Sequence, residues 1–193
     1  MSDIFMVIPA PPAGLPPGSA IPVPLAADPV QDSYFSQTYA SKGAAVVEIR
    51  GFSLSAENAT TIGSGATGAG AGKVKFNPLQ VQRSVDRLSP TLFAISSSGA
   101  HFPTVQIFVR KPGGTPPGRP YLAYEFSMVF VSGIQWSADA GEEAPVEQVD
   151  FAYGSLAVGY YPQQPDGSFG RPTKLGWSQI TNTATGPDAL STF

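Results

Sequence analysis

The sequence predicts a mainly β fold, a small antiparallel β-barrel of two sheets with one short α-helix and a long proline-rich N-terminal insertion. Apolar and polar residues alternate over residues 104–110 and 122–130, which is the period of half-buried strands. Only one short segment carries the start and stop signals of a helix. The chain also holds 21 glycines and 20 prolines among 193 residues, which is typical of strands joined by many turns.

The composition narrows the classes of function. Charged residues make up 13% of the chain, about half of the roughly 25% of an ordinary soluble domain. A net charge of -3 offers no basic field for phosphates, so we expect no nucleic-acid partner. Without cysteine there is no disulfide framework and no thiolate site. No apolar run is long enough for a membrane helix, so we expect a single domain over residues 1–193 with no membrane insertion.

The first segments are a short strand and a proline-rich arm. The apolar run 4–8 predicts a strand. Prolines then recur between residues 9 and 29, and because they fix φ and remove donors, we expect an extended arm or insertion over residues 9–41. A loose N-terminal tail is the alternative.

The next predicted strand runs from residue 45 to 54. Its apolar positions change from odd to even across Gly51, which predicts a β-bulge there, because one inserted residue exchanges the two faces of a strand. A glycine-rich extended loop is expected over residues 57–72, and the alternation resumes as a strand over residues 73–76.

The single predicted helix follows. Ser89 is the expected N-cap, Pro90 occupies the first helical position, and Gly99 ends the helix. The strands 104–110 and 122–130 come next, and the sequence KPGGTPPGRP between them predicts a hairpin that pairs them antiparallel.

The last long strand is predicted over residues 146–161. Its apolar positions change from odd to even at Gly154, which predicts a second bulge. At about 3.3 Å per residue this strand would be about 50 Å long if straight, so it must coil around a closed or nearly closed sheet. Residues 183–193 are expected to be a C-terminal tail.

Candidate catalytic groups are few. Gly63, Gly65 and Gly68 match the dinucleotide motif formally, but a strand follows them where the motif needs a helix. His101 is the only histidine and no nucleophile elbow accompanies it, so it is interpreted as a structural residue. The acids Asp139, Glu142 and Glu143 are interpreted as a solvated loop rather than a metal or acid/base site. We therefore expect no catalytic residue, no cofactor and no metal.

Several segments, in order and spacing, resemble the Hcp family, the haemolysin-coregulated proteins of type VI secretion systems. These segments cover most of residues 44–182 and are VEIRGFSLS (47–55), GAGAGKVKF (68–76), VDRLSPTLFAISSSGAHFP (85–103), IFVRKPGG (107–114), VEQVDFAYGSLAVGYYPQ (146–163) and the tail 170–182 with LGW. The family-motif positions among them are Ser89, Pro90, Gly99, His101, Pro103, Phe151, Tyr153, Tyr160, Tyr161 and Trp177. The arm over residues 9–41 looks longer than the family's usual first connection.

The resemblance implies a structural protein without enzymatic activity or cofactor. Its subunits would form homohexameric rings that stack into a tube, carry effector cargo, and contact sheath and spike proteins. The protein would be cytoplasmic before assembly and then exported through the type VI apparatus without a signal peptide. The loop 57–72 resembles the family's ring-stacking loop, with the candidate residues Glu57, Asn58, Gly63, Gly65, Gly68, Gly70 and Gly72. An effector adaptor or binding module of a related contractile apparatus is the alternative.

Overall fold

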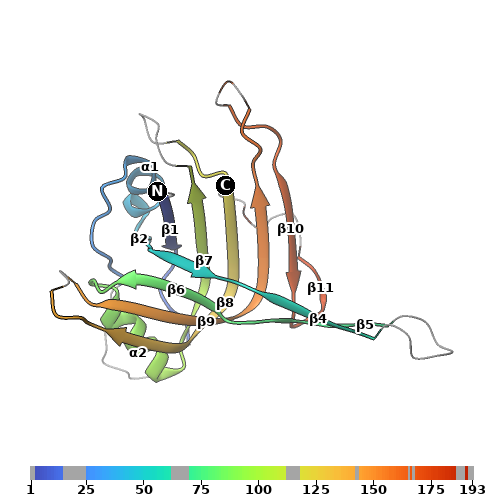
Figure 1. The fold of residues 1–193 in the computed structure, drawn as a ribbon, viewed down its shortest axis with the longest axis horizontal. Helices are drawn as coiled ribbons and strands as arrows, with labels where there is room; N and C mark the ends of the chain where they lie inside the picture. The colour runs from blue at the N-terminus through green and yellow to red at the C-terminus, as the bar shows by residue number, and fades with distance from the viewer. Residues whose placement is uncertain are drawn as a thin grey trace.

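Strands dominate the protein and form two antiparallel sheets, as predicted (Figure 1). The computed structural model describes residues 3–14, 25–61, 70–111, 118–141, 144–164, 166, 168–185 and 190. The strands are β1 (Asp3–Ile8), β2 (Ala45–Glu48), β3 (Gly51–Ser53), β4 (Ala56–Thr61), β5 (Gly70–Phe76), β6 (Leu79–Ser84), β7 (His101–Arg110), β8 (Leu122–Ser137), β9 (Val146–Tyr160), β10 (Thr173–Ser178) and β11 (Thr183–Ala184). The helices are α1 (Ser33–Thr38), the 3-10 helix η1 (Ala40–Lys42) and α2 (Ser89–Ser98).

The larger sheet has nine strands and is organised around β9. Along the sheet the order is β11-β10-β9-β8-β7-β1-β2, and β6 joins β9 to β3. The first half of β9 pairs with β6 and the second half with β10, while β8 runs beside both halves. In Figure 1, β9 runs across the lower part of the molecule and then turns upward. The predicted long, bending strand and the antiparallel pair of β7 with β8 are therefore confirmed.

The sheet curls strongly, but its described strands do not form a closed barrel. β2 pairs with β1 and β3 pairs with β6, and the chain steps from one neighbour to the other at Ile49 and Arg50. Ile49 N donates to Ile4 O at 2.9 Å, and Arg50 N donates to Gln82 O at 2.8 Å. The two sides of the sheet meet at this step without a continuous ladder, so of the closed or nearly closed sheet that was expected, the described strands form the second.

Neither glycine expected at a bulge shifts the register. The strand breaks before Gly51, at Ile49 and Arg50. Near Gly154 the pairing of β8 with β9 stays in register, and the shift occurs instead between Val131 and Gly133. Gly154 makes room for a neighbour, because a Cβ there would come within 2.6 Å of Ile180 Cδ1.

The helix α2 is confirmed, with one change at its start. Pro90 lies in its first turn and Gly99 ends it with φ 72°. Ser89 is not the N-cap, which is Leu88. The Ser89 hydroxyl instead accepts from Asp86 N and donates to Glu147 Oε2.

A second helix, α1, lies inside the segment expected as an extended arm. Asp32 caps it, because Asp32 Oδ1 accepts a hydrogen bond from Phe35 N at 3.0 Å. Phe35 is fully buried and stacks on Phe5 at a centroid distance of 4.1 Å. Burial of this ring makes the latter part of the arm a core element, which corrects the sequence prediction of one helix.

Apolar side chains pack on both faces of the curled sheet. The larger cluster lies inside the curl and includes α2, with buried residues such as Leu92, Phe102 and Phe151. The smaller cluster lies between α1 and the sheet, around Phe35 and Phe108. Of the helices described, none has the length and apolar character needed to cross a membrane.

Candidate assembly surfaces

An apolar surface runs across β8, β9 and β10 on one face of the sheet. Residues directly opposite one another in antiparallel strands place their side chains on the same face. Phe126, Leu156 and Trp177 form one such cross-strand row. Tyr124, Val158 and Leu175 form the next row, and Leu122, Tyr160 and Thr173 form the third. We call these nine residues the apolar face.

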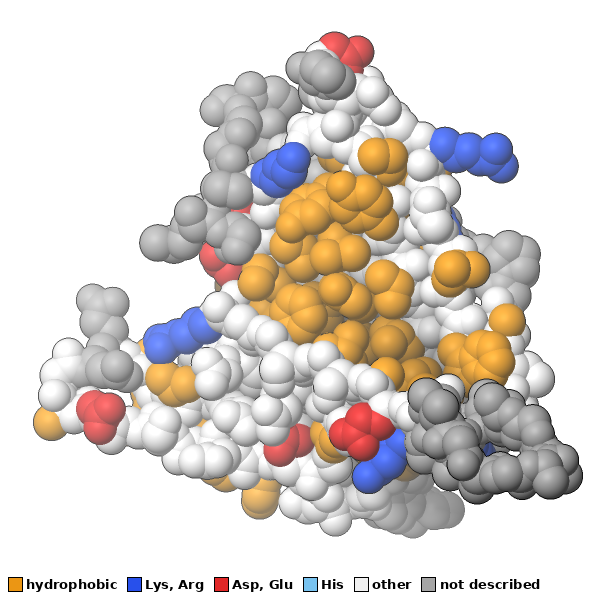
Figure 2. All heavy atoms as spheres, turned by 45° about the vertical axis from the view of Figure 1, so that its right-hand side comes forward, with side chains coloured by type: hydrophobic (Ala, Val, Ile, Leu, Met, Phe, Trp, Pro, Cys, Tyr) orange, Lys and Arg blue, Asp and Glu red, His pale blue; other side chains and the backbone are white. Residues whose placement is uncertain are grey.

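Exposure increases across this face from β8 to β10. Phe126 is fully buried, Tyr160 is 49% exposed and Leu175 is 78% exposed. Two further exposed residues, Ile180 and Met128, lie against Gly154, two residues before Leu156 of the first row. Figure 2 shows hydrophobic side chains gathered in one broad patch on this side of the molecule. Exposed apolar surface of this kind is typical of sites that contact another protein.

The opposite face of the same strands is covered. Leu190 is fully buried there, beside Ala123 and Ala157. It fits over Gly159, where a Cβ would come within 2.8 Å of Leu190 Cδ1, and Lys174 Nζ donates to Leu190 O at 2.8 Å. The described residues thus cover this face, whereas the apolar face is exposed along β9 and β10, at Tyr160, Leu175 and Trp177.

The second candidate surface is the hairpin of β4 and β5. Part of the segment 57–72 that was expected to be a loop is strand, because Ala56 pairs with Phe76 and the ladder continues to Thr61 and Gly70. Glu57 and Asn58 lie in β4, and Gly70 and Gly72 lie in β5. Gly63, Gly65 and Gly68 lie outside the described residues. Figure 1 shows the hairpin projecting from the side of the molecule.

The base of this hairpin is fixed to the larger sheet. Gln179 Oε1 accepts from Phe76 N at 3.2 Å, and Gln179 Nε2 donates to Tyr153 O at 2.5 Å. The Phe76 ring stacks on Tyr153 at 5.4 Å. Asn77 Nδ2 donates to Glu57 Oε1 at 2.7 Å. Glu57 therefore helps to hold the hairpin base.

The family-motif positions fall into different roles. Tyr160 and Trp177 share the apolar face, whereas Phe151 and Tyr153 lie in the larger core. His101 exchanges two backbone hydrogen bonds with Ala13 of the arm. The remaining positions lie in α2 (Ser89, Pro90), at its end (Gly99), in β7 (Pro103) and just after β9 (Tyr161). They do not converge on a single site.

Burial shifts the pKa of two tyrosines near these surfaces. Burial raises the pKa of Tyr153 to about 12, so its hydroxyl stays neutral. Burial also raises the pKa of Tyr124, and the nearby Tyr121 adds to this shift. Within the described ranges, no group of three or more His, Cys, Asp or Glu side chains could hold a metal ion.

Two residues of the exposed patch were not predicted from the sequence. Leu175 and Ile180 follow the last long predicted strand and were not assigned to a strand face. The signal in the sequence that bears on this surface is the change of apolar positions in β9 from odd to even. The alternation of buried residues in β9 is interrupted at Tyr153 and Gly154, which are both buried, and Leu156 packs on the same core cluster as Tyr153 although their positions differ in parity. The face of β9 that meets this cluster therefore changes near Gly154, while its pairing with β8 stays in register.

Comparisons with known proteins agree on one family. The family model described as "Type VI secretion system effector, Hcp" matches residues 37–160. Protein hcp1 of Pseudomonas aeruginosa is 33% identical over 107 residues, which is 55% of this chain and 65% of that relative. The match thus spans slightly less than two thirds of the relative's length.

Solved structures share the fold over nearly the whole chain. A structure described as a type six secretion system protein aligns with 96% of this chain and 100% of its own, at a TM-score of 0.72 and 27% identity. Hcp1 from Salmonella typhimurium aligns with 95% of this chain and 99% of its own, at a TM-score of 0.65 and 22% identity. At 22% identity, the similarity to the Salmonella protein shows the fold alone.

Proposed function

Because the chain belongs to the Hcp family of type VI secretion system proteins, we propose that it is a structural subunit of the inner tube of such a system. Its copies form hexameric rings, and the rings stack into a tube that carries effectors for contractile ejection. The partners are other copies of the chain, sheath and spike proteins, and effector cargo. The chain assembles in the cytoplasm and is exported through the apparatus.

The apolar face of β8, β9 and β10 carries this proposal. A lone subunit would leave Leu175, Tyr160 and Trp177 in water, and burying each large apolar side chain contributes about 1.5 to 3 kcal/mol. In a homo-oligomer, an identical neighbour covers such a face on every copy. The low content of charged residues fits a subunit with a large buried contact area.

The hairpin of β4 and β5 supports the stacking part of the proposal. It projects beyond the larger sheet, and its base is fixed by Gln179 and Asn77. A projecting hairpin with a rigid base can reach a neighbouring ring. We propose that the segment 57–72 makes this contact, with Glu57, Asn58, Gly63, Gly65, Gly68, Gly70 and Gly72 as its candidate residues.

The first experiment measures mass in solution. A hexamer of the 20.1 kDa chain should have a mass of about 120 kDa. Leu175→Glu places a charge in the proposed contact and should shift the protein to the monomer. Leu175 is 78% exposed in the single chain, so the substitution itself should not unfold the monomer.

Gln37→Glu is the matched control. It adds the same charge at an exposed position of α1, away from the apolar face, and should leave the hexamer intact. A wild-type protein that stays at 20.1 kDa at high concentration contradicts the proposal and favours a monomeric adaptor. Electron microscopy of Gly63→Val/Gly65→Val/Gly68→Val tests stacking, because single rings without tubes are expected.

A further inference from the structure

Two aromatic side chains are exposed together where α2 packs against the end of β8. Phe93 of α2 is 54% exposed, and Trp136 of β8 is 48% exposed. Their rings contact each other, with centroids 5.9 Å apart. Single exposed apolar residues are common, but Trp is among the residues most enriched where one protein anchors another. We call Phe93 and Trp136 the aromatic pair.

The aromatic pair is held in place by the fold beneath it. Trp136 lies directly opposite Glu147 in the ladder of β8 and β9, and Trp136 Nε1 donates to Glu147 Oε1 at 2.7 Å. The buried Glu147 carboxylate thus binds the only polar atom of the Trp136 side chain. Phe93 is fixed through its helix, because the neighbouring Leu92 and Ile95 are buried in the larger core. The pair therefore offers a partner apolar ring surface that loses little conformational freedom on binding.

The exposed apolar side chains fall into two main groups. Eight large hydrophobic side chains are exposed among the described residues. Five of them lie on the apolar face or beside it, and the aromatic pair accounts for two more. The eighth, Phe130, lies against the ring of His101 at a centroid distance of 5.0 Å. No charged residue belongs to the apolar face or to the aromatic pair, so contact between the two groups would bury no charge of their own.

The two groups lie on different sides of the molecule. In Figure 1, α2 lies at the lower left and β10 at the right. Figure 2 turns the right-hand side forward and shows the broad hydrophobic patch there. A face-to-face dimer through the apolar face would leave both aromatic pairs in water. A head-to-tail contact covers both groups on every copy, and such contacts generate rings when the rotation between copies closes.

We propose that the aromatic pair of one copy packs against the apolar face of the next copy, where Tyr160, Leu175 and Trp177 are exposed. The two rings are the anchors of a larger contact, since a stable interface buries about 800 Å² on each partner. This inference rests on the proposed function. It adds which two surfaces meet, and it gives the ring a direction.

Two variants with one defective surface each test the contact. Phe93→Glu places a charge in the aromatic pair, and Leu175→Glu places one in the apolar face. Each variant alone should shift from about 120 kDa to the 20.1 kDa monomer. Mixed in equal amounts, the two should form a dimer of about 40 kDa, because one keeps an intact apolar face and the other an intact aromatic pair. That dimer cannot grow, since both of its outer surfaces carry the added charge.

Sedimentation velocity measures these masses. Gln37→Glu adds the same charge at an exposed position of α1 and should keep the mass of the wild type. Phe93 and Leu175 are both exposed, so circular dichroism should show that the two variants stay folded.

Crosslinking captures the same contact where it is short-lived. The chain has no cysteine, so introduced thiols report only on each other. A mixture of Phe93→Cys and Leu175→Cys chains, treated with a short bismaleimide, should give a covalent dimer, whereas neither chain alone should. Chains that carry both substitutions should give a ladder of covalent products that ends at six chains. Gln37→Cys in place of Leu175→Cys is the control and should give no dimer.

The opposite outcomes separate this inference from the proposed function. Full assembly of Phe93→Glu, or crosslinking of Leu175→Cys chains with one another, would overturn the head-to-tail assignment and leave self-assembly standing. The same holds if the wild type assembles but the mixture of the two glutamate variants stays monomeric and the cysteine mixture gives no dimer. A wild-type chain that neither assembles nor crosslinks through these cysteines would overturn both proposals.

Discussion

Arg83 and Glu147 face each other directly across β6 and β9, and neither side chain is exposed. Arg83 Nη1 lies 3.4 Å from Glu147 Oε2. Trp136 Nε1 donates to Glu147 Oε1 at 2.7 Å from the other side, and Arg83 also pairs with Asp86 before α2. One buried carboxylate thus joins β6, β8, β9 and the start of α2.

Breaking this pair should destabilise the protein more than replacing it. Arg83→Met leaves the buried Glu147 carboxylate without a cation and should cost about 3 to 5 kcal/mol in the free energy of unfolding. Glu147→Leu leaves Arg83 paired with Asp86 alone and should cost less than Arg83→Met. The double variant Arg83→Met/Glu147→Leu should cost much less than the sum. Urea unfolding measures each value. Trp136→Phe, which removes one donor, should cost only about 1 kcal/mol, and strictly additive losses would refute the coupling.

Tyr153 should make the protein sensitive to alkaline pH. Burial raises the pKa of its hydroxyl from 10.0 to about 12, so the folded state favours the neutral form. The resulting stabilisation is complete below pH about 10 and is lost as the pH rises through about 12. Between pH 8 and pH 11, the free energy of unfolding of Tyr153→Phe should therefore fall by about 1 kcal/mol less than that of the wild type.

The matched control for this measurement is Tyr160→Phe. It removes the hydroxyl of an exposed tyrosine on the same strand and should leave the alkaline profile of urea unfolding unchanged. At pH 8 the Tyr153→Phe variant should be about as stable as the wild type, because no described residue hydrogen-bonds to the Tyr153 hydroxyl. Parallel pH profiles for the wild type and Tyr153→Phe would disprove the prediction.

The fit of Leu190 over Gly159 should appear as a coupling between the two positions. Gly159→Ala alone should cost about 1 to 3 kcal/mol, because its Cβ collides with Leu190 Cδ1. Leu190→Ala alone should cost about 2 to 5 kcal/mol through the cavity that it leaves. In the double variant the new methyl group fills part of that cavity, so the combined loss should be smaller than the sum. Thermal unfolding of the four proteins checks this, and Gly51→Ala, which meets nothing within 4 Å, is the control.

Asp32 should have two separable effects on α1. Its Oδ1 accepts from Phe35 N, and its Oδ2 pairs with Arg110 at 2.6 Å. Burial acts to lower the pKa of Arg110, but hydrogen bonds and charge from Asp32 and Asp3 outweigh it and raise that pKa, so the guanidinium stays charged.

Variants at Asp32 resolve these two contributions. Asp32→Asn keeps the capping oxygen and loses the ion pair, whereas Asp32→Ala loses both. The second variant should be less stable than the first by about 1 kcal/mol, the usual value of an N-cap. Hydrogen exchange of the α1 amides and urea unfolding measure the difference. Equal stability of the two variants would show that the cap contributes nothing.

Local patterns predicted most strands, including β1 and β7, which are buried on both faces over part of their length. The alternation over residues 104–110 and 122–130 indicated β7 and β8, and Pro90 and Gly99 marked the ends of α2. The same reasoning located the change of packed face near Gly154, but this change occurs without a shift of register between β8 and β9. Periodicity along one strand does not reveal which of its apolar residues stay exposed in the folded chain.

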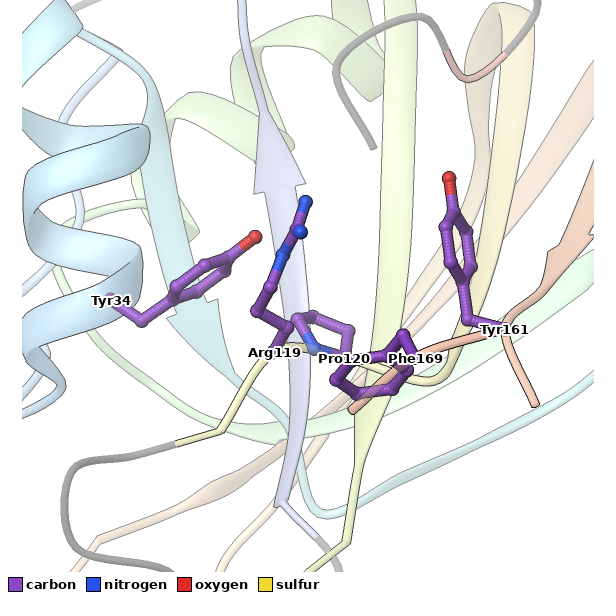
Figure 3. A pocket seen from close by; sticks show the side chains of 5 residues that line it. All are labelled: Tyr34, Arg119, Pro120, Tyr161 and Phe169. Atoms are coloured by element: carbon purple, nitrogen blue, oxygen red, sulfur yellow. The ribbon is translucent and has the colours of Figure 1, made fainter. Parts of the chain in front are cut away.

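Long-range contacts account for most of what the sequence did not reveal. The six residues of α1 carry no strong periodicity, and the helix depends on the packing of Phe35 against Phe5 and Phe108, which are far away in the sequence. A small pocket lined by Tyr34, Arg119, Pro120, Tyr161 and Phe169 likewise gathers residues that lie far apart in the sequence (Figure 3). Its aromatic and cationic members look like ordinary turn residues until the fold brings them together.

At Ile49 and Arg50 the chain changes its pairing partner from β1 to β6. Only two backbone hydrogen bonds flank this step, one to each neighbouring strand, so bending there breaks no ladder. A change of curvature at this step would leave the ladders of β7, β8 and β9 paired. In the assembly proposed above, we expect small differences of shape between protomers to be absorbed at this step rather than in those ladders.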